Sequence, residues 1–590
     1  MMKTRPSYIK VAANCITSCW RAHPPLFIGM VLSAALLCAV QVGEVFAMRH
    51  FFDAVAAYVA GQLPINDVIV AVVPLAILLI AFPIVNTIAW IGQGYFWRRG
   101  SGYLMARYHE RIQRIPLIDF EKTETFDRMK KAQIGSEDAP SAGRSVIQFV
   151  FYFIPYLVFT SVFLVSVKPV LLFALLIIFT SVLLAQILRA GIIIKFTEQN
   201  AGLQRQTDYL ESCITGREYI KETRTLGATG YFFNLFIDSV KRFNKASMKA
   251  ERRVALIELL LRAVNVLGYA GILVLLVYYV VEGSVSVGAF AAVFYSIERM
   301  TDLMRGIVDY FGDLLKEMGT ASFTYEFLKP VGGCQTPTEY AKKADIRLED
   351  ISFIYPEGGK DVLKDITLTI RQGETIAIVG ENGAGKTTLT RMITGLYHPT
   401  SGVVRYGGED IRRYTAEARS SCISGVFQNF IRYKLTAREN IIISDGGARD
   451  ETQKVKQAAA EAGVQLENLP DGPDTMLSRE FAGTELSGGQ WQRIATARGL
   501  YRAHDIIILD EPTAAIDPIE ESNIFRLFKE SSEGKTAVLV THRLGSTKIA
   551  DRILMMEDGQ LCELGTHDEL MACDGKYARM YREQASWYNR

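Results

Sequence analysis

The sequence lacks the features that mark several common protein classes. Its eight cysteines are scattered without a CxxC pair and its seven histidines do not cluster, which argues against a zinc site or a disulfide framework. The charges nearly cancel: 65 basic and 63 acidic residues leave a net charge of +2, so we expect no nucleic-acid partner. The N-terminus has no small-residue cleavage site after a short apolar core, and we expect it to be retained. Cys15 and Cys19 lie one helical turn apart near the first apolar segment, where packing is a better interpretation than acylation.

Apolar residues are distributed unevenly along the chain. A chain of 590 residues exceeds one hydrophobic core, and the mean hydropathy of +0.14 averages an apolar first half with an ordinary second half. Six segments are long and apolar enough to cross the hydrocarbon of a bilayer. They are residues 26–48, 68–96, 146–167, 170–194, 263–281 and 287–303.

This pattern predicts an all-α six-helix transmembrane domain fused to a second domain of α/β type. We expect the transmembrane domain over residues 1–325, with an N-terminal interfacial helix, then a linker over 326–345 and the second domain over 346–590. The loops 98–144 and 195–262 are long and rich in Lys and Arg, whereas the opposing turns are poor in them, so both termini are predicted to be cytoplasmic.

The two long loops have a helical pattern, so we expect the flanking spans to continue as helices into the cytoplasm. Their tips carry aromatic residues, Phe120 and Phe126 in the first loop and Tyr219 in the second. Docking into a groove of another domain and simple anchoring of the loop are both consistent with this pattern.

Polar residues inside the predicted spans are costly and point to a cavity. The candidates are Glu44, Asn86, Arg189 and Asn265, although Arg189 is near a span end and could reach the interface instead. The sixth span also carries a stripe of charges on one helical face, which either lines a path or is solvated beyond the bilayer. The stripe consists of Glu298, Asp302, Arg305 and Asp309.

The second domain contains a phosphate-binding motif. An apolar strand, "ETIAIVG", is followed by a Gly-rich turn and a helix, so the pattern GxxxxGK[ST] is met by Gly380, Gly385, Lys386 and Thr387. Glycines let backbone N–H groups point at phosphate oxygens, Lys386 reaches the β and γ phosphates, and the Thr387 hydroxyl ligates Mg²⁺.

Three further segments carry residues suited to phosphoryl transfer. The strand "IIILDE" ends in Asp510, suited to hold a magnesium shell, and Glu511, placed to polarise water. The strand "TAVLVTH" delivers His542 to the same edge of a parallel sheet. The segment "LSGGQ" opens a helix with a second anion-binding cap, made by Ser487, Gly488, Gly489 and Gln490. The pattern leaves open whether this cap and the GxxxxGK[ST] turn, called the P-loop, bind one nucleotide together or two separate nucleotides.

Together these motifs identify the chain as similar, over nearly its whole length, to half-size ABC transporters of the exporter type. The resemblance implies ATP and Mg²⁺ as cofactors and assigns roles to individual residues. Nucleotide binding is implied for Tyr355, Gly380, Asn382, Gly383, Gly385, Lys386, Thr387, Thr388, Ser487, Gly488, Gly489 and Gln490. Metal binding is implied for Thr387, Gln428 and Asp510, and a catalytic role for Glu511, His542, Lys386 and Gln428. The segment 515–517 matches the D-loop, and the two loop tips match coupling helices.

The resemblance also bears on assembly and location. The resemblance implies that two copies of such a chain meet head to tail, so that the LSGGQ segment of one, the signature of this family, covers the ATP of the other. A homodimer would then have two complete sites, and a heterodimer is the alternative. We expect a multi-pass protein of the bacterial inner membrane with its ATPase domain in the cytoplasm and a lipid bilayer around its spans.

The substrate is indicated only by local similarity. The segments "ENGAG", "FQNFIRYKLTARENI" and "SGGQWQRIA" are similar to bacteriocin and lantibiotic exporters, so a peptide is favoured over a lipid or a drug. With fewer than thirty residues before the first span, we expect no peptidase domain. "LSREFAGTE" departs from the usual stretch before the signature, which leaves its contacts open. The alternatives are an importer on the exporter fold, an ATP-gated channel or regulator, and a tethered soluble ATPase.

Overall fold

The computed structural model describes residues 8–329, 344–446, 451–510, 525–526, 528–530 and 532–588, and the chain divides into two compact units. The N-terminal unit comprises residues 1–114 and 127–329. The C-terminal unit comprises residues 330–590 together with a short segment from the first long loop, Ile115–Phe126. The domain boundaries expected from the sequence placed all of residues 1–325 in one domain, whereas the structure assigns Ile115–Phe126 of the first loop to the C-terminal unit.

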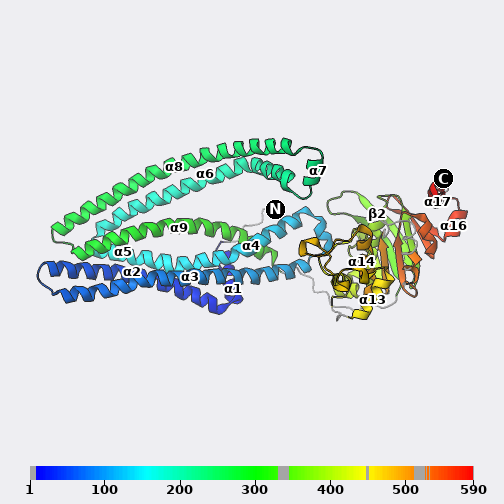
Figure 1. The fold of residues 1–590 in the computed structure, drawn as a ribbon, viewed down its shortest axis with the longest axis horizontal. Coiled ribbons are helices and arrows are strands. Elements are labelled where there is room, and N and C mark those ends of the chain that lie inside the picture. Colours follow the sequence, from blue (N-terminus) through cyan, green and yellow to red (C-terminus); the bar gives the residue numbers. More distant parts are fainter. Residues whose placement is uncertain are drawn as a thin grey trace. The chain divides into compact units, whose positions relative to one another are not determined.

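The described part of the N-terminal unit is helical, as predicted, and its long helices run side by side (Figure 1). The helices are α1 (Tyr8–Ala22), α2 (Pro24–Val59), α3 (Ile65–Gln113), α4 (Thr123–Gln148), α5 (Ile154–Val167), α6 (Pro169–Thr215), α7 (Ile220–Thr225), α8 (Thr229–Val281) and α9 (Val287–Phe327). The π-helical turn η2 (Phe149–Phe153) joins α4 to α5. The helices that flank the two long loops continue well beyond their apolar segments, which confirms the prediction that they extend as helices.

Four of the six predicted spans lie in described helices that are long and apolar enough to cross a membrane. Among the described residues, four helical segments have the length and composition to cross a membrane: Pro24–Val59, Ile65–Gln113, Thr123–Val167 and Thr229–Val281. α9 adds a shorter apolar stretch, Val287–Ile297, and α6 begins with the apolar run that formed the fourth predicted span. Tight turns join consecutive helices, and only Lys168 lies between α5 and α6.

α1 packs closely against the unit rather than standing free. Cys15 and Cys19 are both buried, so their packing is confirmed. Cys15 belongs to a core cluster with Val11 of the same helix and Leu104 of α3. A small residue opposite, Gly143 of α4, leaves room for the Cys19 sulfur, which would lie 2.9 Å from a Cβ at that position.

The C-terminal unit is built on two sheets. The smaller sheet has the order β2-β1-β4-β5 and its strands are antiparallel, with burial that alternates along β1 as expected for a sheet covered on one face. Its strands are β1 (Ile346–Ile354), β2 (Asp361–Ile370), β4 (Ser401–Tyr406) and β5 (Glu409–Asp410).

The larger sheet has the order β10-β9-β3-β8-β7-β6 and is parallel except for the edge strand β10. Its central strands β7 and β8 are buried at every residue, because helices cover both faces of such a sheet. The strands are β3 (Thr375–Gly380), β6 (Ile423–Val426), β7 (Ile506–Asp510), β8 (Thr536–Val540), β9 (Arg552–Glu557) and β10 (Gln560–Gly565).

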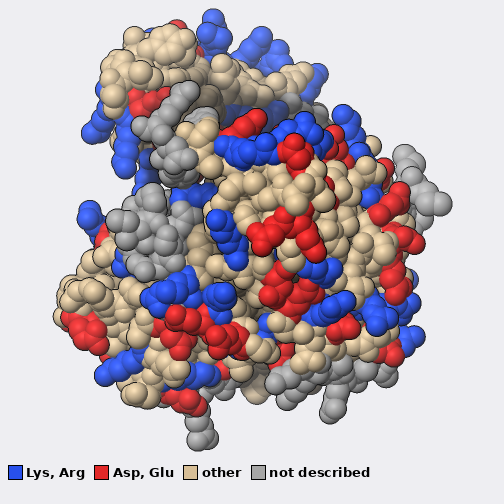
Figure 2. Space-filling model, turned by 90° about the vertical axis from the view of Figure 1, so that its right-hand side faces the viewer, with Lys and Arg blue, Asp and Glu red and all other residues tan. Residues whose placement is uncertain are grey.

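Helices complete the C-terminal unit around the larger sheet. They are α10 (Lys386–Ile393), α11 (Ala416–Cys422), α12 (Ala437–Ile442), α13 (Thr452–Glu461), α14 (Gly488–Tyr501), α16 (His567–Ala572) and α17 (Lys576–Tyr588), with short 3-10 turns that include η1 (Leu117–Glu121) and η7 (Leu544–Ile549). α12, α13 and α14 share a core of their own around Trp491. Figure 2 shows basic and acidic side chains interspersed over one face of the molecule, in keeping with the near-zero net charge.

Gly135 of α4 allows an especially close approach to α9, and its replacement tests the packing of the N-terminal unit. A Cβ at Gly135 would lie 2.2 Å from the Thr320 carbonyl oxygen and 2.5 Å from Thr324 Oγ1. We expect Gly135→Ala to lower stability by about 1–3 kcal/mol, because overpacking forces backbone to move, and to lower the melting temperature in detergent. Gly319→Ala on α9 is the control, since a Cβ there meets no atom within 4 Å. Equal melting temperatures for the two variants would contradict the packing.

Candidate functional site

The parallel strands of the larger sheet bring the predicted site residues to one edge. The P-loop follows β3, Gln428 follows β6, Asp510 ends β7 and His542 follows β8. Because these four strands are parallel, their carboxyl ends lie at the same edge, where ligands bind in folds of this type. The register pairs Asp510 with Val540, so Asp510 and His542 leave neighbouring strands close together.

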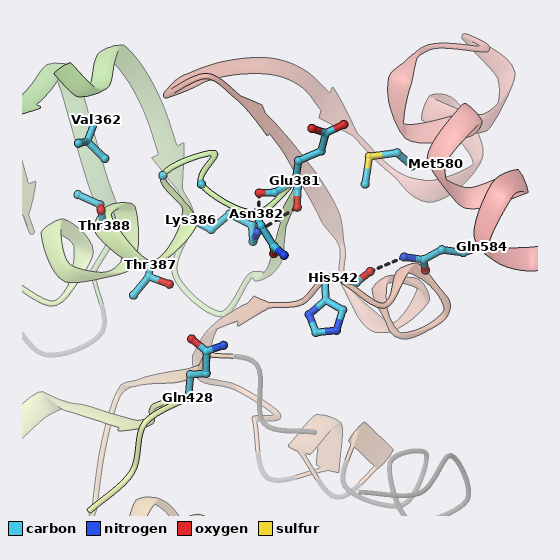
Figure 3. Close-up of a pocket in the computed structure, with 13 residues that line it drawn as sticks. Val362, Glu381, Asn382, Lys386, Thr387, Thr388, Gln428, His542, Met580 and Gln584 are labelled. Carbon is cyan, nitrogen blue, oxygen red and sulfur yellow. Dashed lines mark hydrogen bonds between the residues drawn. The ribbon is translucent and has the colours of Figure 1, made fainter. Parts of the chain in front are cut away.

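A cavity of about 740 Å³ opens at this edge, a size that suits a small-molecule ligand. Its lining includes Gly380, Asn382, Gly383, Gly385, Lys386, Thr387, Thr388, Gln428 and His542. Figure 3 shows the Lys386, Thr387, Gln428 and His542 side chains gathered around it. The structure therefore brings together most of the phosphate-binding and catalytic residues expected from the sequence.

The P-loop backbone is shaped as the motif requires. Gly380, Gly383 and Gly385 have φ angles of 150°, 88° and 95°, which only glycine adopts readily. A Cβ at Gly380 would lie 2.3 Å from the Met556 carbonyl oxygen, so the turn also depends on close contact with β9. Gly385 then caps α10, whose first backbone N–H groups face the cavity end of the loop.

Lys386 supplies the positive charge of the cavity. It is the first residue of α10 and is 6% exposed, and its ammonium donates to the Gly380 and Glu381 carbonyl oxygens, each at 2.9 Å. A buried ammonium next to free helix N–H groups favours phosphate oxygens. These residues thus fit the phosphates of a nucleoside triphosphate.

Magnesium fits the same edge by its donor set. Among the described residues, no group of three or more His, Cys, Asp or Glu side chains could hold a metal by itself. Mg²⁺ usually takes one or two protein ligands and keeps the phosphates and waters as the rest. Thr387, Gln428 and Asp510 offer such a small set of oxygen ligands.

Other predicted residues lie outside this cavity. Ser487 caps α14 in a capping box with Gln490: the Gln490 N–H donates to Ser487 Oγ at 3.3 Å and the Ser487 N–H donates to Gln490 Oε1 at 2.9 Å. Gly488 and Gly489 are the first two residues of the same helix. None of the four lines the cavity. Glu511 and the segment 515–517 lie outside the described residues.

Tyr355 lies beside the P-loop helix and is held by polar contacts. Its hydroxyl shares a hydrogen bond with Thr388 Oγ1 at 3.1 Å and accepts from Arg391 Nη1 at 2.9 Å. Its ring packs edge-on against Phe353 and Tyr397. Tyr355 is thereby tied to the helix that carries Thr388.

The tip of the first long loop joins this cluster from within the C-terminal unit. Glu121, at the end of η1, forms an ion pair with Arg391 at 3.6 Å and accepts a hydrogen bond from the Tyr397 hydroxyl. Burial and the bond to Glu121 raise the pKa of Tyr397, so its phenol stays protonated and donates. Ile118 of the same turn packs on the sheet core. One chain of contacts thus runs from Glu121 through Arg391 to Tyr355.

At this tip the structure favours the anchoring alternative for the aromatic residues, and other residues make the polar contacts. Phe120 and Phe126 pack against each other, with ring centroids 6.1 Å apart, and the polar contacts come from Glu121 and Thr123. The Thr123 N–H donates to Glu357 Oε1 at 2.9 Å. Tyr219, at the second tip, packs edge-on against Tyr209 within the N-terminal unit.

Comparison with known proteins decides the class of this site. Residues 363–514 match the family described as ABC transporter. The chain carries an ABC transporter ATPase domain. It is 28% identical to the nisin transport ATP-binding protein of Lactococcus lactis over 83% of each chain, and 29% identical to an ATP-dependent lipid A-core flippase of Alkalilimnicola ehrlichii over 84% of each.

The whole fold is that of an ABC exporter. The structure of a bacterial Atm1-family ABC exporter with ATP bound superposes with a TM-score of 0.78 at 21% identity, covering 95% of this chain and 99% of that one. The fold is thus that of a half-size ABC exporter, in which a unit of long apolar helices precedes an ATPase domain that matches the ABC transporter family. The P-loop, strand and signature motifs carried this conclusion in the sequence.

Four residues of the cavity lining were missed by the sequence analysis. Val362, Glu381, Met580 and Gln584 line it. Val362 belongs to the other sheet, and Met580 and Gln584 belong to α17, which is nearly two hundred residues from the P-loop. Only an amphipathic pattern in α17 signals that one of its faces is buried.

The contact chain from Glu121 predicts how the loop tip is held. We expect Glu121→Gln to speed amide hydrogen exchange in Leu117–Glu121 several-fold, because the ion pair to Arg391 is lost and a half-exposed pair contributes about 0.5–1 kcal/mol. Glu110→Gln, an exposed acid on α3, is the control and should leave the exchange of this turn unchanged. Exchange that is identical in wild type and Glu121→Gln would show that the ion pair does not hold the tip.

Proposed function

We propose that the protein is a homodimeric exporter of the bacterial inner membrane that uses ATP binding and hydrolysis to move a peptide substrate. The observation that carries this proposal is the convergence of four parallel strand ends on one edge of the sheet, where residues following β3, β6 and β8 line a cavity with a buried ammonium. The nisin transport relative supports the substrate class by its name, and the exporter fold supports the direction.

The residues at the edge divide the work of phosphoryl transfer. Lys386 and the backbone N–H groups of the P-loop bind the β and γ phosphates, and Tyr355 stacks on the adenine after releasing Arg391. Thr387, Gln428 and Asp510 would hold Mg²⁺, which would neutralise phosphate charge. Glu511 orients and polarises the attacking water, and His542 contacts the γ-phosphate end of the cavity.

A second copy of the chain completes the site. The Ser487–Gln490 cap forms the N-terminus of α14, where the helix dipole suits an anion, yet it does not line the cavity of its own chain. A two-fold arrangement lets each cap close the other chain's cavity, and both copies then carry complete sites. ATP biases the cycle because it binds the closed arrangement more tightly than the open one.

Glu511→Gln tests the nucleotide half of the proposal. The carboxamide cannot take up a proton from water, so we expect ATP hydrolysis to fall at least about 100-fold while ATP binding persists. Purified protein in lipid nanodiscs with ATP and Mg²⁺ should then be trapped as two chains, measured by native mass spectrometry. Glu533→Gln, an exposed acid after α-helical residues 528–530, is the matched control with normal turnover. Normal hydrolysis by Glu511→Gln, or one chain under all conditions, would contradict the proposal.

A second cavity lies within the N-terminal unit and is the candidate substrate site. Its volume is about 280 Å³, and it is lined by residues of α2, α3, α4, η2 and α9. The polar lining residues are Gln41, Asn86, Gln93, Gln148, Tyr152, Arg299 and Tyr310, and the others are Leu37, Phe82, Phe153, Leu303 and Gly306. Four carboxamides that each donate and accept are matched to the amide groups of a peptide, whereas the aromatic and aliphatic members suit its apolar side chains.

A chain of polar contacts anchors the charged member of this lining. Arg299 Nε donates to the Tyr295 hydroxyl at 3.1 Å, and that hydroxyl donates to Glu44 Oε2 at 2.5 Å. The Arg299 guanidinium also lies 5.3 Å from the centroid of Phe82. Glu44 is 1% exposed and therefore supports the cavity from behind instead of lining it.

The other polar residues expected at a cavity divide in the same way. Asn86 lines the cavity, whereas Asn265 is buried elsewhere and Arg189 forms an ion pair with Glu258 at 3.6 Å. The side chains of the charged stripe, Glu298, Asp302, Arg305 and Asp309, lie outside the described part of α9. Their role remains a prediction.

Substrate stimulation of ATP hydrolysis tests the peptide assignment. In proteoliposomes, panels of linear peptides, phospholipids and hydrophobic dyes should differ, with members of the peptide panel alone raising ATPase activity. Asn86→Leu should raise the half-maximal peptide concentration about tenfold, because a lost amide pair leaves a polar group of the peptide unsatisfied. Thr87→Ala, the exposed neighbour, is the control. Stimulation by lipids or dyes only would overturn the peptide assignment, and ATP-driven peptide movement in the opposite direction would make the protein an importer.

A further inference from the structure

The segment that follows β8 is held by one side chain from the C-terminal helix. Gln584 of α17 uses both ends of its carboxamide: Nε2 donates to the His542 carbonyl oxygen at 2.5 Å, and Oε1 accepts from the Leu544 N–H at 2.9 Å. Figure 3 shows the first of these bonds at the rim of the cavity. A carbonyl needs a donor and an N–H needs an acceptor, so the two partners define the orientation of the amide. With these two hydrogen bonds, Gln584 bridges the backbone of His542 and Leu544.

The sheet no longer determines the backbone at this point. β8 ends at Val540, and the Thr541 N–H still donates to the Ile378 carbonyl oxygen of β3. Beyond Thr541 the chain turns into η7, and the His542 carbonyl is held by Gln584. The direction of the His542 ring, which points into the cavity in Figure 3, therefore depends on a residue outside the sheet.

The sequence of α17 explains why Gln584 reaches this position. Tyr577, Met580, Tyr581 and Gln584 follow the spacing i, i+3, i+4 and i+7, so they share one face of the helix. Tyr577 is fully buried in a core cluster that includes Leu544. Gln584 is the polar end of an otherwise apolar or aromatic face, and it lies at the cavity together with Met580.

A second contact attaches η7 to α17 further from the cavity. The hydroxyls of Thr547 and Tyr577 share a hydrogen bond at 2.7 Å, and Tyr577 also contacts His567 Nδ1 at 2.8 Å. This buried cluster holds the far end of η7 without Gln584. Loss of the Gln584 bonds should therefore loosen the His542 end alone and leave the packing of the helix in place.

We propose that Gln584 is a positioning residue for ATP hydrolysis that acts through His542. The proposal rests on the role of His542 proposed above and adds to it the C-terminal helix as the element that aims the imidazole. The two hydrogen bonds of Gln584 go to the backbone at His542 and Leu544, whereas binding of the nucleotide depends on the P-loop and Lys386. Because misplacing a group in the transition state slows the chemical step, the consequence is a change in kcat with little change in KM for ATP.

Gln584→Leu in the full-length protein in lipid nanodiscs is the primary test. Leucine is a good helix former of similar size that removes both hydrogen bonds. We expect kcat to fall about tenfold, KM for ATP and the melting temperature to stay near wild type, and the Leu544 amide to exchange faster with solvent. Glu583→Gln on the exposed side of the same helix is the matched control with unchanged kinetics.

Two further variants separate positioning from a structural effect. Gln584→Glu keeps the acceptor for Leu544 but places an oxygen against the His542 carbonyl, so kcat should fall at normal stability; this variant carries the test if Gln584→Leu does not fold. In a His542→Ala background, Gln584→Leu should have no further effect on kcat, since the two residues act as a unit.

The results that would overturn the inference are distinct from those that concern the protein's function. A wild-type kcat in Gln584→Leu, an equal loss in the His542→Ala background, or a loss accompanied by a lower melting temperature and a higher KM would each refute the positioning role. Absence of ATP hydrolysis in the wild-type protein would refute the proposed function instead.

Discussion

The parallel register of β3, β6, β7 and β8 is the constraint on which the nucleotide site depends. Parallel strands end at one edge, so four short segments that are far apart in the sequence converge without any direct contact between them. The register is held by strands buried on both faces, where a slip would expose a full row of apolar side chains. The packing that stabilises the core of the domain therefore also fixes the geometry of its site.

Around this edge, residues from outside the sheet hold the segments that carry site residues. Arg391 links Tyr355 to Glu121 on the loop tip, and Gln584 links the segment after β8 to the C-terminal helix. Each link is a single side chain: Arg391 makes polar contacts with Tyr355, Tyr397 and Glu121, and Gln584 makes two hydrogen bonds. Such links order a segment at low cost in buried area, and a ligand that competes for one of their partners can release them.

In the N-terminal unit, polar groups lie between apolar helices. Pro155 has no N–H to give to the preceding turn, and the helix there widens into the π turn η2. Tyr152 and Phe153 of that turn line the cavity together with Arg299 of α9. The guanidinium is tolerated because Tyr295 and the buried Glu44 balance it from behind.

Much of this protein is written in its sequence as local pattern. The apolar runs, the GxxxxGK[ST] turn and the strand ending at Asp510 each depend on neighbours within about twenty residues, so the helical unit, the ATPase fold and most of the residues that line the first cavity could be predicted. The contacts of Glu121 and Gln584, the burial of Glu44 and the composition of the second cavity could not. The contacts of Glu121 and Gln584 join residues forty or more positions apart. Only the packed tertiary structure decides which of many similar polar side chains meet, because the sequence carries no periodic signal for a single long-range contact.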